Sequence, residues 1–131
     1  MSLDLKVYII DDLESMRKII KYNLLHIGFK NIDDCEYPIQ ALQKIKKAFH
    51  QGCPYQLLIC DLTMPKLSGI ELVQQLRQDD NFRSLPILMV ISNSDRKDAE
   101  KIISQGANAL IIKPFSKEQL KEKIDKIMTN Y

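Results

Sequence analysis

Four short, continuous apolar runs constrain the fold of this chain more than any other feature. They cover Val7–Ile10, Leu57–Cys60, Ile87–Ile91 and Ala109–Ile112. Apolar runs of this length, without alternating polar residues, are typical of strands that are covered on both faces of a parallel sheet. A weaker fifth candidate, Asn31–Cys35, lies between the first two runs.

Apolar residues at helical spacing fill the segments between these runs. The positions that recur at this spacing are Met16, Ile19, Ile20, Leu24 and Ile27; Leu42, Ile45 and Phe49; Leu72, Val73 and Leu76; Ala99, Ile102 and Ile103; and Leu120, Ile124 and Ile127. Ser68, with Glu71 three residues on, and Ser116 have the spacing of helix N-caps, and Gly106 is placed to end the fourth helix.

Strands that alternate with helices predict an α/β fold with helices on both faces of the sheet. Five such units fit a flavodoxin-like doubly wound parallel sheet of five strands in the order 2-1-3-4-5, with five helices. The length of 131 residues fits a single domain, 1–131, with its core at about 5–129.

Composition narrows the classes of function. The net charge is only +2 and the lysines are spread over several predicted helices, which argues against nucleic acid or an anionic membrane as a partner. No apolar run approaches the roughly 20 residues that span a bilayer, and the N-terminus lacks an apolar secretory region. Cys35, Cys53 and Cys60 match neither a disulfide framework nor a metal-binding pair, so we expect reduced thiols and a cytoplasmic location.

Polar and charged residues follow four of the predicted strands. Asp11 and Asp12 follow the first, Asp61 ends the third, Ser92 follows the fourth and Lys113 follows the fifth. In doubly wound sheets, ligands bind beyond the carboxyl ends of the strands, so these side chains should converge. Three neighbouring carboxylates repel one another, and a hard cation with oxygen ligands, such as Mg²⁺, offsets that repulsion.

Each of these residues, considered alone, also fits a structural role. The two neighbouring aspartates fit a helix cap, Asp61 and Ser92 fit turns, and Lys113 fits a solvated loop. Their joint placement favours phosphoryl transfer instead. That reaction requires a carboxylate nucleophile, a metal, a cation and a hydroxyl donor held in position.

From about residue 5 to residue 127, the chain resembles the receiver domains of bacterial response regulators, most closely the single-domain chemotaxis (CheY-like) regulators that act on the flagellar motor. The stretches that carry the likeness are Ile9–Asp12, Ser15–Ile19, Asp61–Pro65, Leu85–Val90 and Lys113–Phe115. The acidic pair, the D-x-x-M-P segment and the K-P-F segment are jointly very specific when they occur in this order.

The resemblance implies that Asp61 is the phosphoacceptor. It further implies that Asp12, Asp61 and the backbone carbonyl of Thr63 bind Mg²⁺ directly, while Asp11 orients the metal, often through water. Lys113 would pair with the phosphoryl group, and Ser92 would donate a hydrogen bond to a phosphoryl oxygen. The Lys113–Pro114 peptide bond is expected to be cis.

Loss of the phosphoryl group would follow in-line attack by water, with Thr63 and Ser94 near its path. The module would be a signalling domain that catalyses only its own phosphorylation and dephosphorylation, and would not be an enzyme in the usual sense.

The resemblance also implies partners. The donor would be a sensor histidine kinase or a phosphotransfer protein, and the target a motor switch or another effector protein. The output surface would be formed by the fourth helix, the fifth strand and the fifth helix. Charged residues on that surface include Arg96, Lys97, Lys101, Lys113, Lys117 and Lys121.

Two positions depart from the family pattern. Leu110 stands where many members carry Tyr or Phe, so a rotating aromatic ring is not expected as part of the switch, and Asn93 stands where a small residue is common. One alternative is a pseudo-receiver that binds proteins without phosphorylation, although such domains usually lack one of the acidic residues or the lysine. Another is a phosphatase of the haloacid dehalogenase type, but Thr63 occupies the position of its second aspartate.

Overall fold

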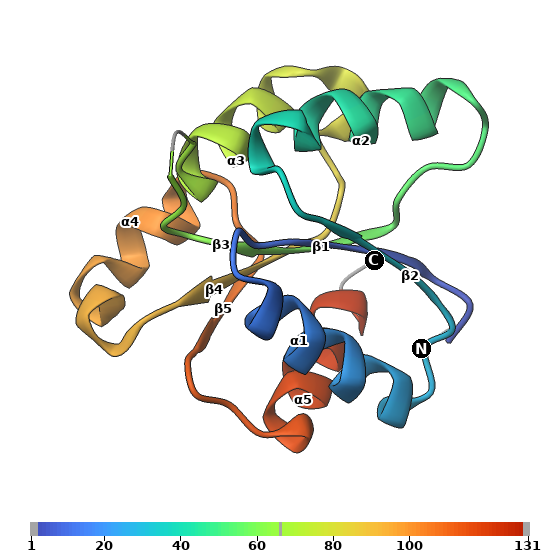
Figure 1. Ribbon diagram of the computed structural model, residues 1–131. Coiled ribbons are helices and arrows are strands. Elements are labelled where there is room, and N and C mark those ends of the chain that lie inside the picture. Colours follow the sequence, from blue (N-terminus) through green and yellow to red (C-terminus); the bar gives the residue numbers. More distant parts are fainter. Residues whose placement is uncertain (1–2, 66, 130–131) are drawn as a thin grey trace.

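The structure, a computed structural model, describes residues 3–65 and 67–129. Five parallel strands form one sheet in the predicted order, β2-β1-β3-β4-β5 (Figure 1). The strands are β1 (Lys6–Ile10), β2 (Asn31–Cys35), β3 (Leu57–Asp61), β4 (Ile87–Ile91) and β5 (Ala109–Ile112). The predicted bounds of β2, β4 and β5 are confirmed, while β1 and β3 are each one residue longer than predicted.

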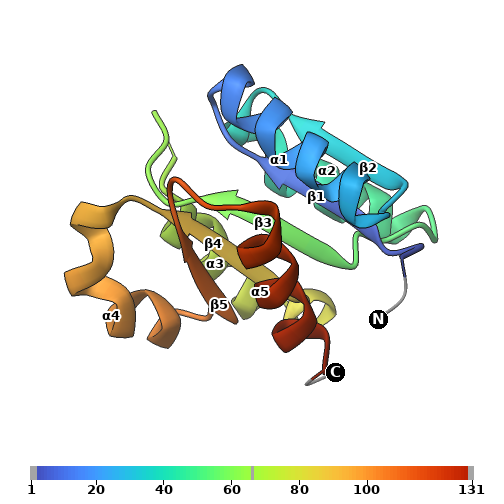
Figure 2. The same cartoon turned by 90° about the horizontal axis from the view of Figure 1, so that it is seen from below.

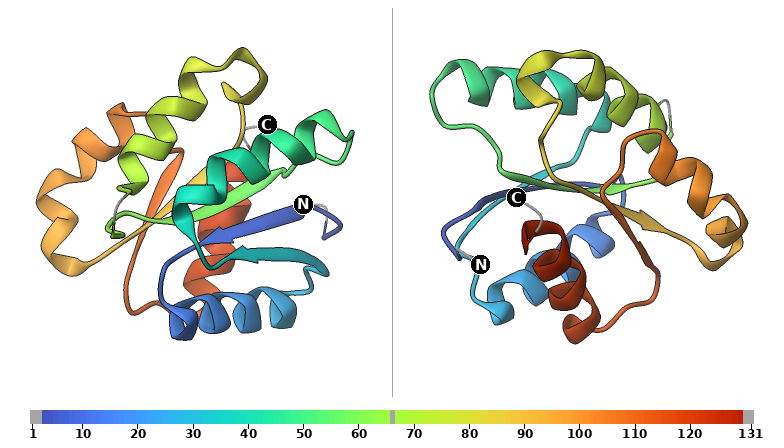
Figure 3. Two further views of the ribbon diagram at one scale, coloured as in Figure 1. Left: turned by 45° about the horizontal axis from the view of Figure 1, so that its top comes forward. Right: turned by 180° about the vertical axis from the view of Figure 1, so that it is seen from behind.

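Helices cover both faces of the sheet. On one face, α1 (Glu14–Ile27) and α5 (Lys117–Thr129) lie side by side (Figure 2). The other face carries α2 (Ala41–His50) and α3 (Gly69–Gln78), with the shorter α4 (Ala99–Ser104) at the outer end (Figure 3). Short 3₁₀ segments precede α2, β4 and α4; they are η1 (Pro38–Gln40), η2 (Asp80–Phe82) and η3 (Asn93–Asp98), respectively. No described helix is long and apolar enough to span a membrane.

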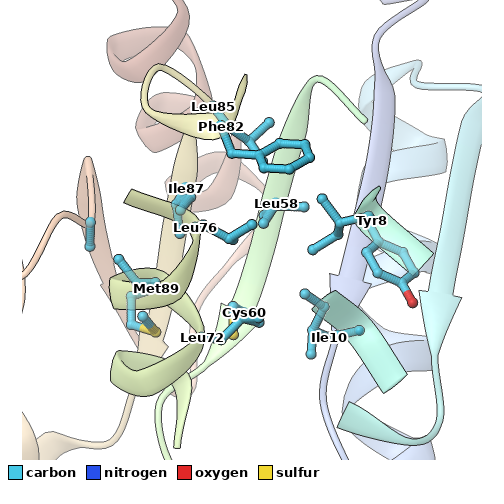
Figure 4. Close-up of a cluster of buried hydrophobic side chains, with 14 of the residues drawn as sticks. Tyr8, Ile10, Leu58, Cys60, Leu72, Leu76, Phe82, Leu85, Ile87 and Met89 are labelled. Atoms are coloured by element: carbon cyan, nitrogen blue, oxygen red, sulfur yellow. The ribbon is translucent and has the colours of Figure 1, made fainter. Parts of the chain in front are cut away.

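Two apolar clusters hold the layers together because each strand directs alternate side chains to opposite faces. Tyr8, Ile10 and Cys60 point toward α2 and α3, where Leu72 and Leu76 complete the cluster (Figure 4). The residues between them in the strands point the other way and pack on α1 and α5; they include Val7, Ile9, Leu57, Ile59, Leu88 and Val90. The apolar runs in the sequence therefore mark strands that are buried on both faces.

The predicted helix ends are confirmed. Ser68 Oγ accepts a hydrogen bond from the Glu71 amide at 3.1 Å, and Ser116 Oγ accepts one from the Gln119 amide at 3.1 Å. Gly106 follows α4 with a φ of 124° and donates its amide to the Ile103 carbonyl at 3.0 Å. A positive φ of this kind favours glycine, which explains why α4 ends there.

Two helices differ from what apolar spacing alone indicates. Ile19 on α1 and Ile103 on α4 follow the apolar pattern, yet these residues are 49% and 41% exposed. On α1 the inward positions are instead Arg17, Ile20 and Leu24, so a charged residue takes part of the buried stripe. The helical segment after β4 also begins as six residues of 3₁₀ helix, none of them buried.

Candidate functional site

The register of the sheet brings the ends of β1, β3, β4 and β5 together at the carboxyl edge, which faces left in Figure 1. Ile10 pairs with Cys60, so Asp11 directly follows a residue that lies beside β3. Asp61 pairs with Val90, two residues before Ser92. The Lys113 amide donates to the Ile91 carbonyl at 2.8 Å, which fixes the start of the loop after β5. Backbone pairing therefore positions these polar residues around one point.

Three carboxylates meet at this edge, as predicted. Asp11, Asp12 and Asp61 each offer an oxygen, and these atoms all lie within 4.8 Å of one another. Asp11 and Asp61 are buried, whereas Asp12 is partly exposed. Lys113 Nζ lies 3.2 Å from Asp61 Oδ1 and is the one cation in direct contact with the described carboxylates of this group. The cluster of three acids and one lysine therefore carries an excess of negative charge.

The electrostatic cost of this arrangement raises the pKa values of two aspartates. Burial raises the pKa of Asp11 to about 6; the hydrogen bond from the Leu13 amide, 2.9 Å long, lowers it, and the charge on Asp61 raises it further. Burial also raises the pKa of Asp61, while the charge of Lys113 opposes that rise. Both carboxylates thus hold their negative charge less readily than they would in water.

The donor set fits a hard divalent cation. Asp11 Oδ2 is buried and has no hydrogen-bond partner among the described residues, although a buried carboxylate oxygen normally has one. Carboxylate oxygens are the ligands that Mg²⁺ prefers, and Mg²⁺ is commonly held by one or two carboxylates together with phosphate and water. A cation bound here would give Asp11 Oδ2 a partner and would offset the excess negative charge of the three carboxylates.

Arg17 supports the turn that carries Asp11, and this role was not predicted from the sequence. Its Nη1 donates to the Asp11 carbonyl at 2.8 Å, and its Nε lies 3.0 Å from Asp34 Oδ2 on β2. The side chain is only 6% exposed. Its sequence signal is an arginine in the inward stripe of α1, three residues before Ile20, and a buried charge of this kind needs partners.

Gly69 fixes the backbone on the other side of Asp61. Its amide donates to the Leu62 carbonyl at 2.8 Å, and a Cβ at this position would lie 2.4 Å from the Asp61 carbonyl oxygen. Only glycine allows α3 to begin this close to β3. Thr63, whose backbone carbonyl was predicted to bind metal, lies on the exposed loop between these two elements.

Ser92 lies at the same edge but is not joined to Asp61. Its hydroxyl donates to Asp95 Oδ2 at 2.7 Å and lies 2.8 Å from the hydroxyl of Ser94. The Lys113–Pro114 peptide bond is cis, as the resemblance implies. The structure therefore brings together Asp11, Asp12, Asp61 and Lys113, and it keeps the Ser92 hydroxyl engaged within its own loop.

Comparison with known proteins identifies the family. A family model of the response regulator receiver domain matches residues 7–125. Chemotaxis protein CheY-3 of Vibrio cholerae is 34% identical over 124 residues, which cover 95% of this chain and 92% of that protein. Chemotaxis protein CheY of Pseudomonas aeruginosa is 36% identical over 123 residues, with 94% and 95% covered.

Solved structures agree with this assignment. Chemotaxis protein CheY4 of Vibrio cholerae superimposes with a TM-score of 0.82 at 26% identity, covering 95% of this chain and 98% of that one. A putative response regulator from Chloroflexus aurantiacus gives a TM-score of 0.86 at 26% identity, covering 96% and 98%.

Receiver domains are signalling modules of two-component systems and are not enzymes in the usual sense. The chain belongs to the response regulator receiver domain family, and its relatives include chemotaxis proteins of the CheY type.

Proposed function

We propose that this domain accepts a phosphoryl group on Asp61 from a histidine kinase or a phosphotransfer protein. The observation that carries the proposal is the contact between Lys113 Nζ and Asp61 Oδ1 at 3.2 Å, inside a group of three convergent carboxylates. A buried aspartate with a lysine and two further acids beside it has the parts that phosphoryl transfer to a carboxylate requires.

Asp11, Asp12 and Asp61, with the backbone carbonyl of Thr63, are the groups that would hold Mg²⁺. When bound, the ion neutralises the charge of the carboxylates and of the phosphoryl oxygens. Arg17 contributes by holding the Asp11 carbonyl, which limits how far the acidic turn can move.

In the transfer step, an Asp61 carboxylate oxygen forms a bond to phosphorus while the bond from phosphorus to the donor histidine nitrogen breaks. The nitrogen keeps the electron pair of that bond. Lys113 is already in contact with Asp61, so its ammonium group is placed to donate to the oxygens of the incoming phosphoryl group. In hydrolysis, water attacks phosphorus in line, the bond from phosphorus to the Asp61 oxygen breaks, and inorganic phosphate leaves as the carboxylate is restored. Thr63 and Ser94 would lie beside the path of this water.

The signal would leave through the surface formed by α4, β5 and α5. A hollow of about 500 Å³ lies there, lined by residues that include Arg96, Leu110, Gln119, Glu122 and Lys123. Leu110 lines this hollow at the position where the family often carries an aromatic ring, so the readout would not use the rotation of a ring. The chemotaxis names of the relatives support an effector such as a motor switch, and the whole chain would act as one cytoplasmic domain.

The test is the intact mass of the protein after incubation with Mg²⁺ and acetyl phosphate. We expect the gain of one phosphoryl group, and its loss on chelation or in Asp61→Asn. Asp80→Asn is the matched control, because Asp80 lies in η2, before the amino end of β4, and 84% of its side chain is exposed. A wild-type protein that gains no mass, or an Asp61→Asn variant that still does, would overturn the proposal and favour a pseudo-receiver.

A further inference from the structure

We propose that Asp95 is a positioning residue that holds the Ser92 hydroxyl in the resting domain, so that helix capping and phosphoryl binding compete for the same hydroxyl. This inference rests on the proposed function, because it concerns how the loop after β4 responds to a phosphoryl group on Asp61. Its support lies in three features of that loop.

The first feature is a closed set of hydrogen bonds between Ser92 and Asp95. Asp95 Oδ2 accepts from the Ser92 hydroxyl at 2.7 Å and from the Ser92 amide at 3.0 Å. In the reverse direction, the Asp95 amide donates to the Ser92 carbonyl at 3.0 Å. Hydrogen bonds to a charged acceptor are stronger than neutral ones, so this oxygen holds the hydroxyl firmly.

The second feature is that the proton of the Ser92 hydroxyl is already engaged. A serine hydroxyl has a single proton to donate, and here Asp95 accepts it at 2.7 Å, while the Ser94 hydroxyl lies 2.8 Å away on the same oxygen. The proton that Ser92 would donate to a phosphoryl oxygen is therefore already in use. Donation to a phosphoryl group requires that the bond to Asp95 breaks.

The third feature is the weak anchoring of the segment that Asp95 belongs to. The segment η3 has six residues of 3₁₀ helix, longer than is common, and none of them is buried. The helix α4 that follows adds only one buried residue, Ile102. Since little apolar burial holds η3 in place, its geometry depends on the hydrogen bonds between Ser92 and Asp95.

These features link the phosphoryl group to the position of α4. When the Ser92 hydroxyl turns to the phosphoryl group, Asp95 keeps the bond from the Ser92 amide but loses the one from the hydroxyl, which weakens the hold on the first turn of η3. The phosphoryl group can shift the loop only by as much as it favours the second arrangement over the first. Asp95 therefore sets the resting bias of the switch, and its removal should favour the phosphoryl-bound arrangement.

The experiment compares wild type with Asp95→Ala, using beryllium fluoride with Mg²⁺ as a noncovalent phosphoryl mimic and calorimetry as the readout. We expect the mimic to bind roughly tenfold more tightly to Asp95→Ala, the effect of one hydrogen bond to a charged group. The melting temperature of the same variant should fall, because its cap is lost. A residue with a merely structural role would not raise affinity while lowering stability.

Two controls isolate the competition. Asp98→Ala removes an acid from the same 3₁₀ segment, but Asp98 makes no side-chain cap hydrogen bond, so affinity should stay at the wild-type value. In a Ser92→Ala background, Asp95→Ala should have no effect on affinity, since there is no hydroxyl left to release. Equal affinity of wild type and Asp95→Ala, or the same gain in the Ser92→Ala background, would overturn the inference.

A second readout needs no phosphoryl group. In the unmodified domain, the Ser92 amide donates to Asp95, so Asp95→Ala should speed its hydrogen exchange at least about tenfold. An unchanged exchange rate would also overturn the inference, whatever the mimic does. Failure of wild type to bind the mimic, with the faster exchange present, would locate the fault in the proposed function and not in the Ser92–Asp95 contact.

Discussion

Two polar clusters lie at opposite edges of the same sheet, and they are built differently. At the amino edge, Arg77 on α3 donates to the Phe82 carbonyl at 2.7 Å, the Gly106 carbonyl at 3.0 Å and Asn108 Oδ1 at 3.0 Å. Asn108 Oδ1 also accepts from the amide of Ile87, at the start of β4, at 2.8 Å. Three of these four contacts join residues more than 20 positions apart in sequence, and the contact with Phe82 joins α3 to the η2 segment that follows it.

At the carboxyl edge the polar groups are in excess of their partners. Three carboxylates share one lysine, and one oxygen of Asp11 is buried without a hydrogen bond from the described residues. Satisfied networks of buried polar groups stabilise a fold, and unsatisfied ones destabilise it. The comparison therefore separates a cluster that serves the fold from a cluster arranged for a ligand.

The largest effect should come from the backbone of the acidic edge. Gly69→Ala would place a Cβ against the Asp61 carbonyl, so α3 or β3 must shift, and we expect the free energy of unfolding to fall by about 3 kcal/mol. Urea denaturation measures this loss. Gly52→Ala is the control, because no atom of the described residues, apart from its chain neighbours, lies within 4 Å of the added Cβ. Only its φ of +80° is strained, and about 1 kcal/mol is expected there. Equal losses would show that the contact with Asp61 does not limit the packing of α3.

At the amino edge, the Arg77 network should contribute stability but no function. Arg77→Met leaves two carbonyls and the Asn108 amide oxygen without this donor, and we expect a loss of about 2 kcal/mol with phosphorylation unchanged. Arg83→Met removes a comparable charge whose ion pair with Asp80 is exposed, so the loss should stay below about 1 kcal/mol. A phosphorylation defect in Arg77→Met would contradict the prediction that the Arg77 cluster serves only the stability of the fold.

The pH dependence of the metal-free domain should reveal the strain in the acidic edge. Between its ordinary pKa of 3.8 and its raised value of about 6, Asp11 keeps a proton in the folded state that the unfolded chain releases. Stability should therefore fall as the pH rises through that window, by at most about 3 kcal/mol. Denaturation at several pH values in the presence of a chelator measures the slope, and Asp11→Asn should reduce it to the part that Asp61 contributes. A slope that is unchanged in Asp11→Asn would contradict the assignment to Asp11.

Much of the fold could be predicted because apolar runs report burial directly. Runs such as Leu57–Cys60 mark strands covered on both faces, and the polar residues after them mark the carboxyl edge. The burial of Arg17 and the exposure of Ile19 were harder to predict. Helical spacing identifies an apolar face, but it does not show that an arginine can be buried in that face when the Asp11 carbonyl and Asp34 are its partners. The engagement of Ser92 by Asp95 was not predicted, because the serine was assigned to the phosphoryl site alone.

We infer that the carboxyl edge is arranged for a cation and a phosphoryl group, and that this arrangement lowers the stability of the fold. The most direct measurement is the free energy of unfolding of wild type and Asp61→Asn at pH 7, with and without Mg²⁺. We predict that Asp61→Asn is at least as stable as wild type without Mg²⁺, because one buried charge is gone, and that only wild type gains stability when Mg²⁺ is added. A variant clearly less stable than wild type without Mg²⁺, or one that gains as much from Mg²⁺, would contradict the account.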